Sequence, residues 1–259
     1  MYSIKNGLPS VFTSLGLISG CISIVVSTAY GDLTLAGYFI IIAAVLDFID
    51  GMVARALKSI TEFGRQLDSL ADVVSFGVAP AMILYRLMLL SYVKSTPNAG
   101  FDVMDPALVE SIVLYSSFLV AVFSALRLAK FNIDPDQAKN FKGLPTPANA
   151  IFISAIGFLA ESSRELPLTG IIFNRYFLLV VIVLSCYFLV SNISMFSLKF
   201  SAFGIRKNFL RYLFLLFAVG LILGFGIQQE ESFSLSGLAP VIVLYIAMSL
   251  INNWFVKME

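Results

Sequence analysis

The sequence contains no histidine among its 259 residues. This absence excludes an imidazole general base, a phosphohistidine intermediate and the zinc sites that use nitrogen ligands. There are two cysteines, Cys21 and Cys186, and both lie inside apolar stretches, where a thiol behaves as a small apolar group. No disulfide framework is therefore predicted, and any metal ion is expected to be held by oxygen atoms.

Charged residues are also scarce. They make up 13% of the chain, whereas 59% is hydrophobic, and the mean hydropathy is +0.91. This balance excludes a soluble globular domain and predicts an all-α, polytopic transmembrane bundle, since about 20 apolar residues in a helix cross a bilayer. We expect one integral membrane domain over residues 1–259. Its eight apolar stretches lie at about 9–30, 34–57, 67–92, 107–129, 146–161, 175–192, 209–227 and 237–254.

The basic residues predict the orientation of these helices. With both termini in the cytoplasm, 13 of the 17 lysines and arginines fall on the cytoplasmic side, as the positive-inside rule requires. We therefore expect a multi-pass protein of the cytoplasmic membrane. The net charge of +1 gives no indication of a nucleic-acid partner. The cytoplasmic set is Lys5, Arg55, Lys58, Arg65, Arg127, Lys130, Lys139, Lys142, Lys199, Arg206, Lys207, Arg211 and Lys257, and the remaining four are Arg86, Lys94, Arg164 and Arg175.

Four aspartates occur in the second and third apolar stretches. Asp47 and Asp50 are three residues apart and Asp68 and Asp72 are four apart, so each pair lies on one face of its helix. A short polar turn near 58–66 folds the two helices into a hairpin, which allows all four carboxylates to converge. Such acids cost about 10 kcal/mol together in a bilayer at roughly 2.5–3.5 kcal/mol each. Divalent cations and a phosphate substrate would offset that cost, which favours a two-metal phosphoryl-transfer site.

Residues beside the aspartates suit a phosphate ligand. Gly51, Ala54 and Gly64 keep the space next to the carboxylates free of large side chains. Arg55 offers a planar fork for phosphate oxygens, and Thr61 offers a hydroxyl group. These residues and the aspartates form the pattern D(x2)DG(x2)AR(x8)G(x3)D(x3)D.

This pattern resembles the signature of the CDP-alcohol phosphotransferase family. The flanking segments LDSLADVVSFGVAPA at 67–81, ALRLAKFN at 125–132 and FKGLPTPANA at 141–150 look like those of the branch that uses serine as the acceptor. The resemblance covers about residues 8–200, so we expect a family core followed by two additional helices at about 209–254. It implies transfer of a phosphatidyl group from CDP-diacylglycerol to L-serine, with release of CMP, by a homodimer.

The resemblance also implies roles for the aspartates. Asp47 and Asp68 would bridge two divalent ions, Mg²⁺ or Mn²⁺, and Asp50 would complete the shell of one ion. Asp72 would bind the second ion and act as the base.

The same resemblance implies that the cytidine diphosphate group is held by Thr13, Gly51, Ala54, Arg55, Thr61 and Gly64. The chain departs from the family at Ser10 and Gly16, two positions that asparagine often occupies. Arg127, Asn132 and Lys142 are candidates for binding the serine carboxylate or a phosphate. For these three, an ordinary position at a membrane surface is an equally good interpretation.

Two alternatives remain open. One is a related enzyme with another acceptor, such as glycerol 3-phosphate or inositol phosphate, or with an ether-lipid donor. The other is a cation transporter whose ion site is formed by the four acids. Transporters usually carry inverted repeats and binding sites at the midplane, and neither feature is predicted here.

Overall fold

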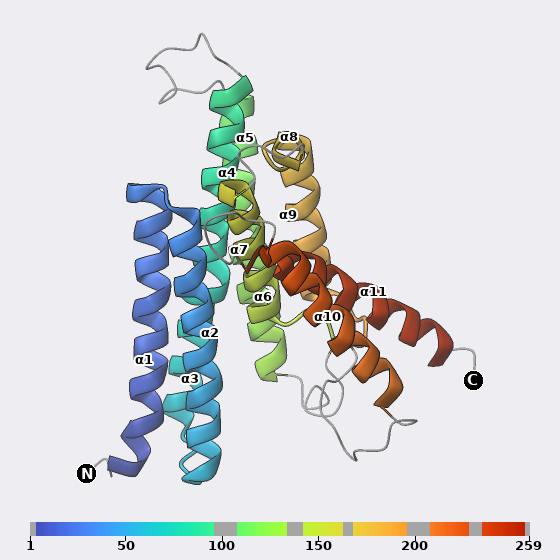
Figure 1. Cartoon of the computed structure of the whole chain (residues 1–259). Coiled ribbons are helices and arrows are strands. Elements are labelled where there is room, and N and C mark those ends of the chain that lie inside the picture. Colours follow the sequence, from blue (N-terminus) through green and yellow to red (C-terminus); the bar gives the residue numbers. More distant parts are fainter. Residues whose placement is uncertain are drawn as a thin grey trace.

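The computed structural model describes residues 4–95, 108–133, 142–162, 168–195, 208–227 and 235–256. Within these ranges the chain is helical apart from turns, short connections and one isolated bridge between Lys142 and Ser194. Figure 1 shows the long helices side by side as a bundle. The elements are α1 (Ile4–Val25), η1 (Val26–Tyr30), α2 (Leu33–Ala56), α3 (Glu62–Asp72), η2 (Val73–Val78), α4 (Ala79–Ser95), α5 (Leu108–Tyr115), η4 (Ser116–Phe118), α6 (Leu119–Ile133), α7 (Thr146–Ser162), α8 (Leu168–Ile172), α9 (Arg175–Val190), α10 (Phe209–Ile227), η7 (Leu235–Gly237) and α11 (Leu238–Val256).

The predicted helical membrane bundle is confirmed, because each of the eight apolar stretches contains a long helical segment. Five described helical segments are long and apolar enough to span a membrane: Gly7–Tyr30, Leu33–Ala56, Glu62–Ser95, Leu108–Ile133 and Leu235–Asn253. Three apolar helices are shorter: Thr146–Glu161, Arg175–Val190 and Leu210–Phe225. Some basic residues used to predict the orientation lie outside the described residues, namely Lys139, Arg164, Lys199, Arg206, Lys207 and Lys257.

The third helix begins earlier than its apolar stretch suggested. It starts at Glu62, because the Thr61 side chain accepts a hydrogen bond of 3.0 Å from the Gly64 amide and so caps the helix. From there α3, η2 and α4 follow one another without a break to Ser95. The middle piece, Val73–Val78, is a π-helical turn directly after Asp72, a local irregularity of the kind that often marks functional positions.

The first helix packs closely on this continuous segment. The Ser75 hydroxyl donates a hydrogen bond of 3.1 Å to the Gly16 carbonyl oxygen. A Cβ atom at Gly20 would lie 2.8 Å from the Cα atom of Ser75, so only glycine fits there without a shift. The other side of α1 lies against α2, where the Ala43 carbonyl oxygen is near Gly16. These contacts hold α1, α2 and η2 together around the aspartates.

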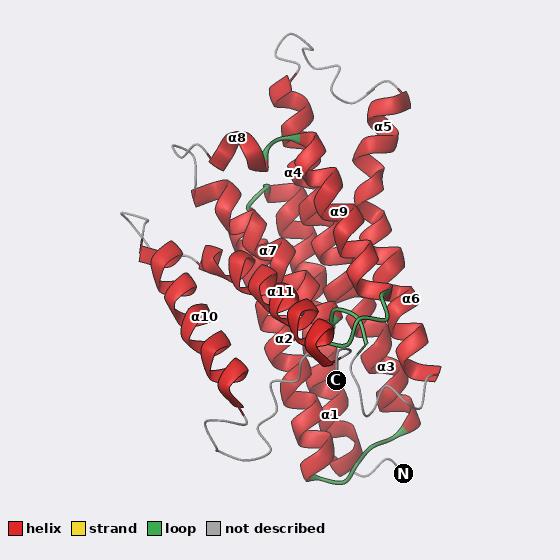
Figure 2. Cartoon of the chain, turned by 90° about the vertical axis from the view of Figure 1, so that its right-hand side faces the viewer, coloured by secondary structure: helices red, strands yellow, loops and turns green. Residues whose placement is uncertain are grey.

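The last two long helices form a hairpin that covers α7. Phe214 and Ala218 of α10 share an apolar cluster with Val241 of α11, and Ala239 of α11 packs in a second cluster with Phe158 of α7. Figure 1 shows both helices running obliquely to the others, and Figure 2 shows α11 crossing in front of α7. We call the end of the bundle that carries the α2–α3 turn, residues 57–61, the site end. The opposite end, at Gly31 and Ser95, is the far end.

Candidate metal and substrate site

Three of the predicted aspartates form a cluster near the site end. Asp47 and Asp50 of α2 and Asp68 of α3 each offer a carboxylate oxygen, and these atoms all lie within 4.8 Å of one another. If all three were ionised and without a counter-ion, each pair would repel by at least about 3 kcal/mol at an effective dielectric constant of about 20. A hard divalent cation, which prefers several carboxylate oxygens, would relieve this repulsion. The donor set therefore fits a metal ion.

Asp50 is fixed by a partner from the first helix. It is only 5% exposed, and the Thr13 hydroxyl donates a hydrogen bond of 2.6 Å to its Oδ2. The same hydroxyl is 3.1 Å from the Pro9 carbonyl oxygen, but a carboxylate is the stronger acceptor. The expected nucleotide contact of Thr13 stays a prediction, and in the structure its hydroxyl orients a carboxylate of the cluster.

Asp72 lies in the same small pocket but is not part of the three-residue cluster. It is one turn further along α3, beside the π-helical turn that starts at Val73. The pocket has room for about 10 Å³, close to what one water molecule or one small ion requires. A bulky substrate must therefore bind above this pocket. The lining residues are Thr13, Gly16, Ala43, Asp47, Asp50, Asp68, Ala71, Asp72, Ser75 and Phe76.

The predicted nucleotide residues surround the α2–α3 turn. The turn is tight: Lys58 adopts a left-handed conformation with φ of 52°, and the Ser59 amide donates a hydrogen bond of 3.0 Å to the Ala54 carbonyl oxygen. The exposed side chain of Arg55 folds back beside Gly51, so its guanidinium lies near the backbone of α2. Thr61 caps α3, and Gly64 faces its hydroxyl group. The structure thus brings Gly51, Ala54, Arg55, Thr61 and Gly64 to one end of the hairpin.

The candidates for acceptor binding divide into two kinds. Asn132 donates a hydrogen bond of 2.9 Å to the Ser69 hydroxyl, and Lys142 forms the isolated bridge with Ser194, so both make contacts within the protein. Arg127 of α6 is different. It is 8% exposed, its Nε atom is buried without a hydrogen-bond partner among the described residues, and it interacts electrostatically with Asp72. A buried guanidinium with an unused donor beside the acidic pocket suits an anionic substrate group.

Two further residues of interest were not identified from the sequence. Asn149 of α7 is fully buried, and neither polar atom of its side chain has a hydrogen-bond partner among the described residues. It lies within the segment 141–150 that supported the family resemblance, which is the signal that would have singled it out. Tyr245 of α11 interacts electrostatically with Arg127, although its helix lies outside the segment that resembled the family. No sequence pattern pointed to Tyr245, because its proximity to Arg127 depends on how the last hairpin packs.

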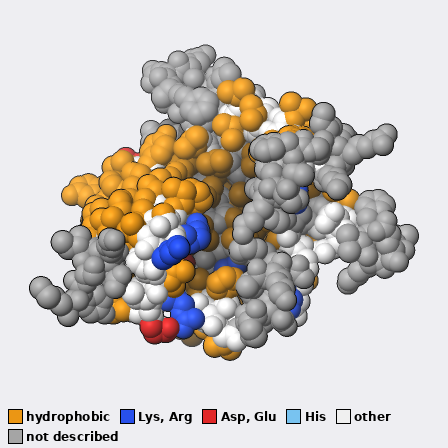
Figure 3. Space-filling view, turned by 90° about the horizontal axis from the view of Figure 1, so that it is seen from below, with side chains coloured by type: hydrophobic (Ala, Val, Ile, Leu, Met, Phe, Trp, Pro, Cys, Tyr) orange, Lys and Arg blue, Asp and Glu red, His pale blue; other side chains and the backbone are white. Residues whose placement is uncertain are grey.

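The surface at the site end is suited to anions. Figure 3 looks onto this end and shows lysine and arginine side chains in several separate places, one of them beside an acidic side chain. Acidic residues of the cluster are half-buried or buried beneath the surface. A negatively charged nucleotide would therefore meet basic groups first and the carboxylates only through bound cations.

Comparisons with known proteins identify the family of the chain. Residues 6–187 match the family model described as CDP-alcohol phosphatidyltransferase. A Helicobacter pylori protein named CDP-diacylglycerol–serine O-phosphatidyltransferase is 33% identical over 147 residues, which cover 56% of this chain and 54% of that protein. A Bacillus subtilis protein of the same name is 33% identical over 153 residues, or 59% and 76% of the two chains.

An archaeal relative carries a different name. The protein from Methanothermobacter thermautotrophicus named archaetidylserine synthase is 35% identical over 161 residues, which cover 60% of this chain and 61% of that protein. The chain spans about half the length of the Helicobacter relatives that it matches. The family model, in contrast, matches well over half of this chain. The protein belongs to the CDP-alcohol phosphatidyltransferase family.

Proposed function

We propose that this protein transfers the phosphatidyl group of CDP-diacylglycerol to the hydroxyl group of L-serine, which yields phosphatidylserine and CMP. The observation that carries the proposal is the cluster of Asp47, Asp50 and Asp68 at one end of membrane-spanning helices, with Asp72 in the same pocket. The names of the bacterial relatives support serine as the acceptor.

The aspartates are proposed to hold two divalent ions, Mg²⁺ or Mn²⁺. Asp47 and Asp68 would be shared between the ions, while Asp50 would serve one and Asp72 the other. When bound, such ions neutralise charge on the pyrophosphate and on the departing oxygen. Thr13 supports this role, because its hydrogen bond of 2.6 Å holds the Asp50 carboxylate in one orientation.

Asp72 is the proposed base. In the reaction a bond forms between the serine hydroxyl oxygen and the lipid-proximal phosphorus, the bond from that phosphorus to CMP breaks, and the hydroxyl proton passes to the Asp72 carboxylate. Its place in the pocket, outside the three-residue cluster, supports a carboxylate with an oxygen available for a proton. Direct displacement is expected, because the chain has no histidine and neither cysteine lies near the cluster.

Arg127 is proposed to hold the carboxylate group of serine. It is buried, has an unused Nε donor and interacts electrostatically with Asp72, so an anion bound there would lie beside the proposed base. Serine carries both a carboxylate and an ammonium group, and a guanidinium fork recognises the former specifically. Acceptors without a carboxylate would lose this contact.

The membrane placement and assembly are also proposals. The bias of basic residues supports a site end that faces the cytoplasm, with both termini on that side of the cytoplasmic membrane. The family resemblance supports a homodimer. Cross-linking of the protein in native membranes would test the dimer, and labelling of single introduced cysteines on either side would test the orientation.

An acceptor assay tests the function. Purified protein that receives CDP-diacylglycerol, Mn²⁺ and labelled L-serine is expected to release CMP and labelled lipid in equal amounts, and a chelator should stop both. Equal CMP release with glycerol 3-phosphate or inositol phosphate would remove the serine assignment, and no release with any acceptor would remove the enzyme.

Two matched variants complete the assay. Asp68→Asn should abolish release, whereas Asp32→Asn, which alters a helix cap at the far end, should not. An ether-lipid donor should be tested in parallel, because one relative is named archaetidylserine synthase. Faster turnover of the ether donor would assign the protein to that lipid class.

A further inference from the structure

A second polar cavity lies at the far end of the bundle, opposite the acidic site. It has a volume of about 530 Å³ and is lined in part by Arg86 and Lys94 of α4 and by Glu161 of α7. Its apolar wall includes Leu90 and Phe173. Since α2 has 24 residues, about 36 Å of helix separates the two ends, so this cavity cannot belong to the acidic site.

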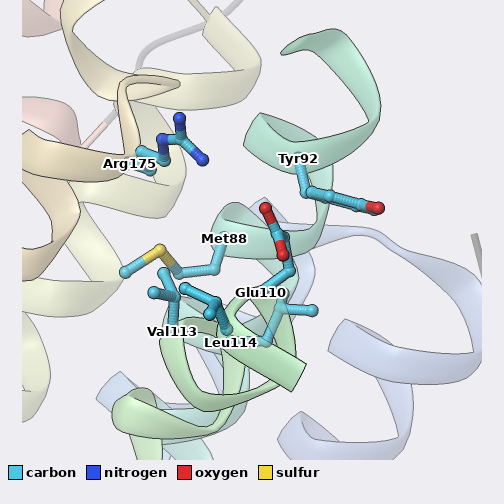
Figure 4. A pocket seen from close by; sticks show the side chains of 7 residues that line it. Met88, Tyr92, Glu110, Val113, Leu114 and Arg175 are labelled. Carbon is cyan, nitrogen blue, oxygen red and sulfur yellow. The ribbon is translucent and has the colours of Figure 1, made fainter. Parts of the chain in front are cut away.

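Two adjoining pockets extend the cavity along α4. A pocket of about 240 Å³ shares Lys94 and Phe173 with it and adds Arg175. A smaller pocket, shown in Figure 4, brings Arg175 and Glu110 toward one space from opposite sides, between Met88 and Tyr92. Three basic side chains therefore line neighbouring pockets at one end of a membrane protein.

The basic groups of this region outnumber the acids that line the same pockets: Arg86, Lys94 and Arg175 stand against Glu110 and Glu161. Glu161 lines the cavity, but its two oxygens accept hydrogen bonds of 2.6 and 3.0 Å from the amides of Leu33 and Thr34 at the start of α2. Within the described ranges the ion pair that the structure contains is Arg65–Glu62, at the site end. Arg86, Lys94 and Arg175 thus have no carboxylate within 4.0 Å in the described part of the chain.

The Arg86 guanidinium lies beside the α1–α2 turn. Its Nε atom is buried and has no hydrogen-bond partner among the described residues. Gly31 adopts φ of 71°, and a Cβ atom there would lie 2.7 Å from the Nη2 atom of Arg86. The α1–α2 turn therefore makes room for this side chain. A guanidinium with a buried, unused donor can bind an anion.

We propose that this cavity binds the phosphate group of a phospholipid in the leaflet opposite to the acidic site. Arg86 and Lys94 would hold the phosphate, and an acyl chain would lie along Leu90, Val93 and Phe173. The ammonium group of Lys94 already lies 5.4 Å from the centre of the Phe173 ring, at the boundary between the polar and apolar walls. The proposal is independent of the reaction proposed above. The same basic groups would also accept free phosphate, so the experiment must separate the two sources.

Native mass spectrometry of the purified protein in detergent tests the proposal. The protein receives phosphatidylglycerol, diacylglycerol with the same acyl chains, or inorganic phosphate, and the retained ligand is counted. We expect retention of phosphatidylglycerol but not of diacylglycerol. Arg86→Gln should weaken retention about tenfold or more, because it removes a charge-assisted contact. Arg86→Lys should weaken it less. Arg65→Gln, which removes the same charge from an exposed position at the site end, should leave it unchanged.

Each outcome decides the proposal. Equal retention of phosphatidylglycerol by the parent, Arg86→Gln and Lys94→Gln would overturn it. Retention of inorganic phosphate but not of the lipid would keep an anion site and reject the lipid as its ligand. If Arg86→Gln does not fold, Lys94→Gln carries the test, because Lys94 is exposed at the rim and its substitution leaves the packed interior unchanged.

Discussion

The hydrogen bond between Thr13 and Asp50 offers a sharp test of the proposed metal site. Thr13→Val replaces the hydroxyl with a methyl group of similar size and so removes the donor that lies 2.6 Å from Asp50 Oδ2. Both residues are buried, at 6% and 5% exposure, so water does not readily replace the lost donor. Asp50 would then be less well oriented toward Asp47 and Asp68, and the affinity for the metal should fall.

The size of the effect follows from the type of bond. A hydrogen bond to a charged group contributes about 1.5–3 kcal/mol, which corresponds to roughly 10- to 150-fold in an equilibrium constant. Partners that orient metal ligands typically contribute about 10- to 100-fold in metal affinity or activity. We therefore expect the Mn²⁺ concentration for half-maximal activity to rise by about 10- to 100-fold in Thr13→Val.

The assay is CMP release as a function of Mn²⁺ concentration, with Mn²⁺ binding measured separately without substrate. Thr13→Ser keeps the hydroxyl and should titrate close to the parent. Thr28→Val is a matched control, because Thr28 is exposed at the far end and its hydroxyl bonds to the Ile24 carbonyl oxygen. If Thr13→Val shows the Mn²⁺ dependence of the parent in both measurements, Thr13 does not position a metal ligand and the reasoning fails.

Three further predictions test other parts of the structure. Asp72→Asn should lower turnover by about 10²- to 10⁴-fold, which is the usual contribution of a general base. Binding of CDP-diacylglycerol, measured by equilibrium dialysis, should stay near the parent value. A fully active variant would refute the proposed base. Arg127→Gln should raise KM for serine by about tenfold or more with a smaller change in kcat, and an unchanged KM would remove the carboxylate contact. Gly20→Ala should destabilise the protein by about 1–3 kcal/mol in thermal unfolding, since the new Cβ would lie 2.8 Å from the Cα atom of Ser75. Gly220→Ala, with no atom within 4 Å, should be neutral or stabilising by up to about 1 kcal/mol, so equal effects of the two changes would contradict the close packing of α1.

The length of the apolar runs and the spacing of the aspartates explain which features could be predicted from the sequence. Apolar runs near 20 residues identify membrane helices, and spacings of three and four place Asp47 with Asp50 and Asp68 with Asp72. These arguments correctly anticipated the helices and the approach of three of the aspartates. Within each helix, the spacing alone sets the relative positions of the aspartates, whereas the approach of Asp68 to Asp47 and Asp50 also depends on the short turn between α2 and α3.

Contacts between distant residues could not be anticipated in the same way. Thr13 and Asp50 are 37 residues apart, and their hydrogen bond depends on how α1 settles against α2. The proximity of Tyr245 to Arg127 depends on the oblique packing of the last hairpin. The separation of Asp72 from the other three acids depends on the exact relation of α3 to α2, which a hairpin prediction leaves open.

The hairpin of α10 and α11 has a consequence for how a lipid substrate reaches the site. α11 packs along α7, and Asn253 near its end donates a hydrogen bond of 2.7 Å to the Ser194 carbonyl oxygen, so α11 covers that flank of the bundle. The proposed donor, with its two acyl chains, would then arrive through one of the other flanks. The helices added after the family core thus restrict the direction of lateral entry while leaving the acidic pocket itself untouched.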